Sequence, residues 1–464
     1  MFIPEKFKEK KALVVGAGKS GVACANLLAE HGFKVLLTEE KTAGAVAASL
    51  KCLRRQVTVE TGGHTGAAFD CAFGVKSPGV AHSNKLIIAL KRKKIPVFSE
   101  IEVALAFSGG APLLAVTGTN GKTTTTMLLG DIMRLALGKT GRALVCGNVG
   151  IPVAELAAGA RKGDALVMEV SSYQLEDSSW VKPRVSGLLN ITPDHLDHHG
   201  SMAAYIGAKA RVFKFQSAQD TCVFNYLDAR CVRLARQCPS KKLFFAAGRR
   251  LKALNAWTSG GKIHFKTAKV SFSTRPPALP GTHNLENAMC AGLMALASGA
   301  APAHIRAAFA AFTGVEHRLE PVAAVRGIKF INDSKATNVD STVTALRAMP
   351  EHRSTWLIMG GLDKGTPYAP LRALLRAKVK AVLTIGAGAA RIERELAGSC
   401  PILTSLTMEK ACRSIMKMAA AGDIALFSPA CASFDQFRDF EDRGRKFKAF
   451  TKKLGGRHVP PHAA

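Results

Sequence analysis

The segment Thr117–Thr124 reads TGTNGKTT and lies between an apolar run, Leu113–Val116, and a stretch predicted to be helical from about Lys122. Glycines in such a strand–loop–helix turn let backbone N–H groups approach phosphates, and the helix N-terminus adds partial positive charge. A lysine at this position reaches the β- and γ-phosphates, and the following hydroxyl can bind Mg²⁺. Full Walker spacing needs glycine where Val116 stands, so the loop is a shortened form. It predicts a nucleotide site formed by Gly118, Thr119, Asn120, Gly121, Lys122, Thr123 and Thr124.

Two further residues could work with this loop. Glu169 belongs to an apolar run, Ala165–Val170, that is predicted to be a strand. A carboxylate at the end of a neighbouring strand can hold Mg²⁺ opposite the phosphate loop. Lys209, in the segment YIGAKARVF, taken alone is typical of any lysine on a helix face.

The segment Asn190–His199, NITPDHLDHH, is richer in metal-ligand types than a random loop. Zinc is one interpretation, because histidine and carboxylate side chains both bind it. However, no cysteine lies nearby, and an enzyme of nucleoside triphosphates needs an ion that prefers oxygen, such as Mg²⁺. We therefore expect His195 to lie near a metal, with His198 and His199 as solvated neighbours.

A second glycine-rich turn, Gly16–Gly21, follows the predicted strand Ala12–Val15. With Glu39 at the end of the next strand, it fits a dinucleotide fingerprint. The turn could hold NAD or another nucleotide diphosphate, or it could be a tight turn without a ligand. A second nucleotide-type site beside a phosphate loop argues against a simple dehydrogenase.

Polar motifs also follow predicted strands in the last third of the chain. Ligands of α/β sheets bind at this edge, beyond the carboxyl ends of the strands. Arg318, Lys335 and Lys364 could neutralise phosphate or carboxylate charge there. The motifs are EHR (316–318), NDSKATN (332–338), GGLDKG (360–365) and SPACASFDQF (428–437).

Strands alternate with helices along the chain, which predicts parallel sheets and an α/β fold. Leu188–Ile191 is predicted to be a strand, and Ser108–Pro112 looks like a linker. A Gly-rich patch, Arg249–Lys262, is predicted to be a loop or hairpin. The length of 464 residues favours two to four domains.

The net charge of +30 is the unusual feature of the composition. A nucleic-acid partner would explain it, but basic runs are short and the aromatic-basic pattern of an RNA-binding sheet is missing. We therefore expect a solvated surface that attracts small anionic substrates, and no nucleic-acid partner. No stretch suits a membrane span and no signal core precedes the first strand, so we expect a cytoplasmic protein without membrane insertion. The eleven cysteines, Cys431 included, are expected to be mostly buried thiols.

Taken together, GTNGKTTT, EVSSYQLE, LNITPDHLD, AAYIGAKARVF, EHRLE, INDSKATN, GGLDKG and SPACASFDQFRDFEDRG resemble the Mur ligase family, in its order and over nearly the whole chain. The resemblance implies three α/β domains. They are a Rossmann-like domain for a UDP-linked substrate (1–108), a central P-loop ATPase domain with a mostly parallel sheet (109–314), and a Rossmann-like C-terminal domain (315–464) that binds an amino acid and closes on ATP. The implied enzyme is a monomeric, ATP-dependent ligase that adds D-glutamate to UDP-N-acetylmuramoyl-L-alanine in peptidoglycan precursor synthesis, through an acyl phosphate.

The resemblance also implies roles for individual residues. Lys122, Glu169, His195 and Lys209 would be catalytic. Two Mg²⁺ sites would take their ligands from Thr123, Glu169, His195 and Lys209, the last as a carbamate formed with CO₂. ATP would also contact Asn284, Asn287, Arg318, Asp333 and Lys335. The UDP-linked substrate would contact Lys19, Ser20, Gly21, Glu39, Gly79, Asn148 and Ser171. D-Glutamate would contact Thr337, Lys364, Ser433, Phe434 and Phe440.

Two positions depart from the family pattern: Glu39 stands where aspartate is expected beside the uracil site, and Phe434 replaces a commoner leucine. The alternatives are another Mur ligase or folylpolyglutamate synthetase, which also adds glutamate to an activated carboxylate. That enzyme begins with its ATPase domain, so the first glycine-rich turn and SSYQLE speak against it. A nucleic-acid-binding protein would need no acid, histidine and lysine cluster, and an NAD dehydrogenase leaves the phosphate loop unexplained.

Overall fold

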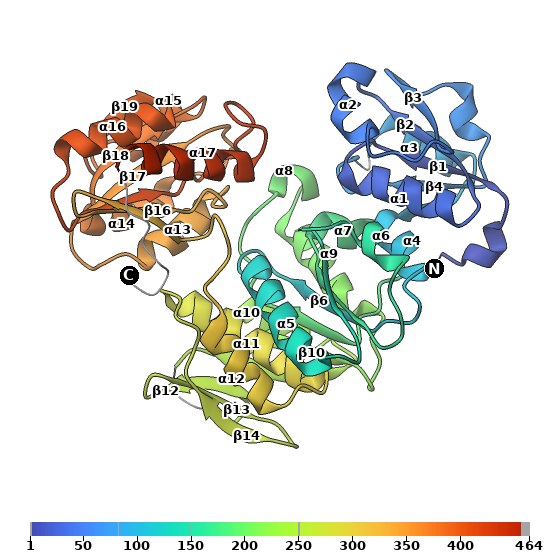
Figure 1. Cartoon of the computed structure of the whole chain (residues 1–464), viewed down its shortest axis with the longest axis horizontal. Coiled ribbons are helices and arrows are strands. Elements are labelled where there is room, and N and C mark those ends of the chain that lie inside the picture. Colours follow the sequence, from blue (N-terminus) through green and yellow to red (C-terminus); the bar gives the residue numbers. More distant parts are fainter. Residues whose placement is uncertain (1, 82, 149, 249–250, 456–464) are drawn as a thin grey trace. The chain divides into compact units, whose positions relative to one another are not determined.

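The computed structural model describes residues 2–81, 83–148, 150–248 and 251–455. These residues form two compact units, one drawn from Met1–Arg275 and Glu286–Phe309, the other from Pro276–Leu285 and Ala310–Ala464. The first unit holds two sheets and the second holds one, which Figure 1 shows in blue, in cyan to yellow-green, and in orange to red. This is the predicted α/β architecture, with N-terminal, middle and C-terminal domains. No helix within the described ranges has both the length and the apolar character needed to cross a membrane.

The N-terminal sheet is parallel, in the order β3-β2-β1-β4-β5. Its central strand is a short apolar run buried on both faces, which fits a parallel sheet covered by helices. The strands are β1 (Lys11–Val15), β2 (Lys34–Glu39), β3 (Thr58–Thr61), β4 (Phe73–Lys76) and β5 (Val97–Ser99). The helices are α1 (Lys19–Glu30), α2 (Ala43–Leu50), α3 (Lys85–Arg92) and α4 (Glu100–Ala106), with short 3₁₀ turns at Pro4–Phe7 and Gly66–Phe69.

The middle sheet has the order β14-β13-β12-β11-β10-β9-β6-β8-β7. Pairing is parallel from β7 to β12 and antiparallel from β12 to β14. Its strands are β6 (Leu113–Thr117), β7 (Ala143–Gly147), β8 (Ala165–Glu169), β9 (Val185–Leu188), β10 (Thr221–Asn225), β11 (Lys241–Ala246), β12 (Ala256–Ser259), β13 (Lys262–Lys266) and β14 (Ser271–Thr274). Its helices are α5 (Lys122–Leu137), α6 (Val153–Ala157), α7 (Ser172–Asp177), α8 (Leu196–His199), α9 (Met202–Lys214), α10 (Ala229–Ala235), α11 (Thr282–Ala297) and α12 (Pro302–Ala311).

The C-terminal sheet has the order β15-β16-β20-β17-β18-β19, and only its edge strand β15 pairs antiparallel among the described strands. Its strands are β15 (Glu320–Val325), β16 (Ile328–Asn332), β17 (Thr355–Gly360), β18 (Val379–Ile385), β19 (Ile402–Leu406) and β20 (Ile424–Phe427). Its helices are α13 (Val339–Arg347), α14 (Arg372–Lys378), α15 (Ala389–Leu396), α16 (Met408–Met418) and α17 (Phe440–Lys453), with a 3₁₀ turn at Ala369–Leu371.

The strand predicted at Leu188–Ile191 has the wrong bounds and lies earlier in the chain. The strand is β9, Val185–Leu188, which pairs with β6 and β10. Leu189 and Ile191 are as deeply buried as strand residues, but they belong to a loop that crosses the end of the sheet. A buried loop can carry the same run of apolar residues as a buried strand, so the sequence pattern did not distinguish the two. The hairpin predicted in Arg249–Lys262 is confirmed by β12 and β13, and residues 249–250 lie outside the described ranges.

Candidate active site

The phosphate loop joins β6 to α5, as its sequence predicts. Gly121 is the N-cap of α5 and has a φ of +86°, a left-handed conformation that favours glycine. A Cβ atom at this position would lie 2.1 Å from Asn287 Oδ1. The close approach brings Asn287, one of the predicted ATP contacts, directly against the loop and requires residue 121 to be glycine.

The side chains of Lys122 and Thr123 contact groups around the loop. Lys122 Nζ donates to the carbonyl oxygens of Gly118 at 3.1 Å and Thr119 at 2.6 Å, so its ammonium group lies over the loop. The Thr123 hydroxyl donates to Glu169 Oε2 at 2.7 Å. The chain therefore places a cation and a hydroxyl where the helix N-terminus begins.

Glu169 is brought to the loop by strand pairing. β8 pairs with β6 so that Glu169 lies opposite Val116, and the carboxylate therefore emerges beside the start of the phosphate loop. The residue is buried, with Oε2 accepting from Thr123 and Oε1 accepting from Asn148 Nδ2 at 2.9 Å. Asn148 was predicted to contact the UDP-linked substrate. In the structure its side-chain amide orients the carboxylate of Glu169.

Lys209 lies inside the protein, on α9, although the residue pattern alone suggests an exposed helix face. Its Nζ donates to Gly118 O at 2.7 Å and lies 4.5 Å from the centre of the Tyr205 ring. Burial, and then the charge of Lys122, lower the pKa of the Lys209 ammonium well below its usual range, against the opposite pull of Asp194. Burial therefore shifts the protonation equilibrium of Lys209 toward the neutral amine.

The loop after β9 is fastened to the phosphate loop. Thr119 Oγ1 donates to Thr192 O and accepts from Thr192 N, at 3.1 and 3.0 Å, and Asn190 exchanges hydrogen bonds with the backbone of Asn120. Parallel pairing of β6 and β9 explains the contact, because both loops leave the same edge of the sheet.

His195 has a φ of +53° and is the N-cap of α8. Its Nδ1 lies 3.2 Å from the Tyr173 hydroxyl, and its Nε2 lies 3.5 Å from Asp194 Oδ2. Asp194 also acts on the pKa of Lys209, so it is a site residue that the sequence analysis did not single out. Its position beside His195 in the PDH motif was the available signal.

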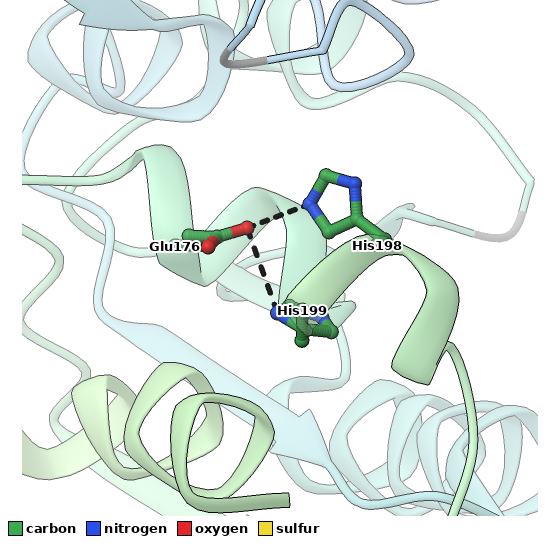
Figure 2. Close-up of side chains that lie close together, drawn as sticks. All are labelled: Glu176, His198 and His199. Atoms are coloured by element: carbon green, nitrogen blue, oxygen red, sulfur yellow. Dashed lines mark hydrogen bonds and ion pairs between the residues drawn. The ribbon is translucent and has the colours of Figure 1, made fainter. Parts of the chain in front are cut away.

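The expectation that His198 and His199 are solvated is wrong for His199, and His198 is half-buried. The His199 side chain is fully buried, and His198 contacts a carboxylate of α7, Glu176, as Figure 2 shows. Helix α8 packs on α9, and both rings contact residues of α7.

The first glycine-rich turn joins β1 to α1. A Cβ on Gly21 would lie 1.9 Å from Gly16 O, so helix and strand approach as closely as glycine allows. Glu39 closes the turn: its Oε2 accepts from Ala17 N at 2.7 Å and its Oε1 accepts from Lys41 N at 3.0 Å.

The other residues predicted for the UDP-linked substrate lie in two places. Lys19 and Ser20 open α1, and Gly79 follows β4, so they share with Glu39 the edge formed by β2, β1 and β4. Ser171 belongs to the middle domain, where it caps α7 through a hydrogen bond from Gln174 N.

In the C-terminal domain the polar motifs meet at one sheet edge. Strands β16, β20 and β17 are neighbours and parallel, so the loops 332–338, 428–437 and 360–365 leave the sheet side by side. Arg443, on α17, is fully buried and joins two of them. It donates to Ser334 Oγ and O, at 3.0 and 2.8 Å, and to the carbonyls of Cys431 and Ala432. The sequence pattern did not single out this arginine.

One of the predicted ATP contacts in this domain, Asp333, is a buried carboxylate. Asp333 accepts from Ser428 Oγ at 2.8 Å and from Leu319 N at 3.1 Å. Burial raises the pKa of Asp333 to about 6, and the charge of Arg318 opposes that rise. Lys335 Nζ lies 4.9 Å from the centre of the Phe440 ring. Asn284, at the start of α11, donates to Pro280 O at 2.7 Å.

The residues predicted for D-glutamate differ in exposure. Thr337 lies in the loop after β16, Lys364 follows β17, and Phe440 begins α17. Ser433 is buried, whereas Phe434 is 70% exposed. The loop that carries Lys364 is held by its neighbour Asp363, which accepts from Tyr368 and from Arg391. Tyr368 also contacts the thiol of Cys431 at 3.1 Å, and this cysteine is a buried thiol, as predicted.

The fold and the site define a three-domain α/β protein with a phosphate-binding loop next to a buried carboxylate. Its parts match three family models: a MurD-like N-terminal domain of Mur ligases (residues 10–99), a Mur ligase middle domain (116–295) and a Mur ligase glutamate ligase domain (317–431). The chain belongs to the Mur ligase family. Members of this family use ATP and Mg²⁺ generally.

Curated relatives match along the full chain. A UDP-N-acetylmuramoylalanine–D-glutamate ligase of Elusimicrobium minutum is 47% identical over 98% of this chain and 100% of its own length. The ligase of the same name from Koribacter versatilis is 41% identical over 96% of this chain and 98% of its own. Among solved structures, a UDP-N-acetylmuramate–alanine ligase from Thermotoga maritima shares the fold, with a TM-score of 0.62 at 18% identity over 96% of this chain and 99% of that one.

Proposed function

We propose that the protein is an ATP-dependent ligase that joins D-glutamate to the alanyl carboxylate of UDP-N-acetylmuramoyl-L-alanine, in the synthesis of peptidoglycan precursors. The observation that carries the proposal is the cluster of half-buried Lys122 and buried Thr123, Glu169 and Lys209 around one phosphate loop. Relatives whose names state this activity match the chain from end to end. We expect the enzyme to act as a monomer in the cytoplasm.

The reaction must first make a carboxylate reactive, because its negative charge opposes attack by an amine. An oxygen of the alanyl carboxylate bonds to the γ-phosphorus of ATP as the bond to the departing ADP breaks. The amine of D-glutamate then attacks the acyl carbon and loses a proton. Phosphate leaves with the former carboxylate oxygen, so the products are an amide, ADP and phosphate.

Lys122 would serve the first step by electrostatics. Its ammonium already lies over the loop, bound to the carbonyls of Gly118 and Thr119. A modest side-chain rotation would bring it to the phosphates, where fixed positive charge lowers the barrier to phosphoryl transfer. The amide groups of the loop and the N-terminus of α5 would add to this field.

The donors at the loop fit Mg²⁺. The hydroxyl of Thr123 and the carboxylate of Glu169 are hard oxygen ligands 2.7 Å apart, and Asn148 orients the carboxylate. When bound, the ion would neutralise charge on the transferring phosphoryl group. These two residues would hold one ion, and His195 and Lys209 are proposed to serve a second.

An ammonium group cannot bind a cation, so Lys209 could serve as a Mg²⁺ ligand only after chemical modification of its side chain. Burial favours its neutral amine, which is the form that reacts with CO₂. The nitrogen bonds to the carbon of CO₂ and a proton is released, leaving a carbamate with two oxygen donors. Proximity to Glu169 and Asp194 is consistent with a shared cation at this position.

The two substrates would bind at strand edges. We propose that Lys19, Ser20 and Gly21, at the start of α1, bind the diphosphate of the UDP-linked substrate, because a helix N-terminus with a glycine turn suits phosphate. Glu39, Gly79, Asn148 and Ser171 complete that set. For D-glutamate we propose Thr337, Lys364, Ser433, Phe434 and Phe440, and for ATP also Asn284, Asn287, Arg318, Asp333 and Lys335.

Phosphate release from ATP tests the proposal. We expect release only when UDP-N-acetylmuramoyl-L-alanine and D-glutamate are both present, and Lys122→Ala should abolish it. Equal release with L-glutamate, or with neither substrate, would contradict the assignment. Release with a folate acceptor and glutamate would instead favour a folylpolyglutamate synthetase-like activity.

A further inference from the structure

A second group of metal-ligand side chains lies outside the phosphate loop, on α7 and α8. His198 Nε2 lies 2.8 Å from Glu176 Oε2, and His199 Nδ1 lies 3.6 Å from the same oxygen. One ligand atom from each of the three residues lies within 4.8 Å of the others. In Figure 2 the carboxylate of Glu176 points between the two imidazole rings.

The separations suit a small ion with short bonds. Two ligands of a tetrahedral ion at about 2.0–2.1 Å lie roughly 3.3 Å apart. The two contacts to Glu176 Oε2, at 2.8 and 3.6 Å, bracket that value, and the ligand nitrogens of the two histidines lie within 4.8 Å of each other, so side-chain rotations would place all three atoms around one centre. Water would complete the coordination.

The surroundings resemble those of a metal-binding histidine. Such a residue usually hydrogen-bonds through its other ring nitrogen, which fixes the ring. His199 does so: Nδ1 faces Glu176, while Nε2 lies 3.0 Å from Ser172 Oγ. Its side chain is fully buried, whereas those of His198 and Glu176 are 19% and 27% exposed, which leaves a route for an ion.

The donor set selects a type of ion. Two imidazole nitrogens and one carboxylate oxygen suit zinc and its neighbours in the first transition series. Mg²⁺ prefers six oxygen ligands and gains little from histidine. The group therefore differs in chemistry from the oxygen donors Thr123 and Glu169 at the phosphate loop.

We propose that Glu176, His198 and His199 form a binding site for Zn²⁺ or a similar transition-metal ion, separate from the Mg²⁺ positions of the phosphate loop. Because the ion would tie α7 to α8, it would also restrain the neighbouring loop. Tyr173 makes the connection, since its ring lies 4.2 Å from that of His198 and its hydroxyl contacts His195.

The test is the stoichiometry of metal binding to the full-length protein in excess Mg²⁺. We expect one equivalent of Zn²⁺ per chain by equilibrium dialysis, lost in His198→Gln and in Glu176→Gln. Co²⁺ in place of Zn²⁺ should give the visible absorption of a tetrahedral site with nitrogen ligands. His304→Gln, on α12, is the control for loss of a histidine elsewhere and should keep the full equivalent.

One further variant separates the proposal from its rivals. Glu169→Gln should keep the Zn²⁺ equivalent, because it alters only the phosphate-loop position. Loss of Zn²⁺ in Glu169→Gln with retention in His198→Gln would mean that zinc replaces Mg²⁺ there, and the proposal would be wrong. No bound Zn²⁺ in the parent protein would also overturn it. Melting curves of His198→Gln, whose side chain is partly exposed, establish that lost binding is not lost folding.

Discussion

Replacing Arg443 by lysine tests how the loops of the C-terminal domain are held. The guanidinium is fully buried and donates to four oxygens on two loops, and burial lowers its pKa to about 10. Lysine keeps the charge but cannot form this fork of hydrogen bonds. Each bond from a charged donor contributes about 1.5–3 kcal/mol, and lysine can retain some of them. We expect Arg443→Lys to destabilise the second unit by about 2–4 kcal/mol, which lowers its melting temperature by roughly 5–15 °C.

The same change should affect one substrate more than the others. Arg443 fastens Ser334 to Cys431 and Ala432, which flank the residues proposed for D-glutamate. A loss of about 1.4 kcal/mol in binding is a tenfold change in affinity. We therefore expect KM for D-glutamate to rise about tenfold or more, with a smaller change in KM for the UDP-linked substrate.

Arg445→Lys is the matched control, because it lies two residues along the same helix. Its side chain is 53% exposed and lies 3.9 Å from Asp439, so we expect an effect within about 0.5 kcal/mol. The assays are differential scanning calorimetry and initial rates with each substrate varied in turn. If Arg443→Lys behaved like Arg445→Lys in both assays, the positioning role would be refuted.

Three other changes probe the phosphate loop. Glu169→Gln should raise the Mg²⁺ concentration needed for half-maximal turnover by about 10- to 100-fold, measured by titration of the rate with Mg²⁺; an unchanged midpoint would remove Glu169 from the metal site. Lys209→Met should abolish turnover yet add about 1–3 kcal/mol of stability at pH 7 in CO₂-free buffer. Burial lowers the pKa of Lys209 in the folded state, so the stability gained by Lys209→Met should shrink as pH rises toward about 10. Urea unfolding at two pH values measures this gain, and a gain that grew with pH would contradict the prediction. Gly121→Ala forces a Cβ against Asn287 at a φ of +86°, so it should cost about 1–3 kcal/mol and weaken binding of an ATP analogue. Gly159→Ala should do neither, because its φ is not positive and the added Cβ would meet only Leu156 O, at 4.0 Å.

The phosphate loop could be predicted from sequence because its signal is local. Glycines, lysine and threonine stand together within a few residues between a strand and a helix, and the structure has that arrangement. Glu169 was predictable for a related reason. It ends an apolar strand, and neighbouring parallel strands end at the same edge of the sheet, so its carboxylate lies beside the loop that follows β6.

Lys209 and Arg443 show where local pattern fails. Both carry a charged group that a helix face usually exposes, and each is buried because other elements pack against its helix. Helix α9 packs on β6 and α7, and α17 packs on β15 and β16. For Lys209 the resemblance to a family supplied what periodicity could not, and for Arg443 nothing did.

The predictions for the loop after β9 were wrong for a different reason. Its apolar residues are buried without being in a strand, and its histidines His198 and His199 contact residues of α7. Both features depend on contacts between segments that are distant along the chain. They could not be read from the sequence of the loop itself.

The central claim is that the phosphate loop passes the γ-phosphoryl group of ATP to the alanyl carboxylate. The most direct test uses UDP-N-acetylmuramoyl-L-alanine with both oxygens of that carboxylate labelled with ¹⁸O, followed by mass analysis of the phosphate released with D-glutamate. Transfer through an acyl phosphate predicts one ¹⁸O atom in each phosphate. Unlabelled phosphate, formed together with the amide product, would contradict the account.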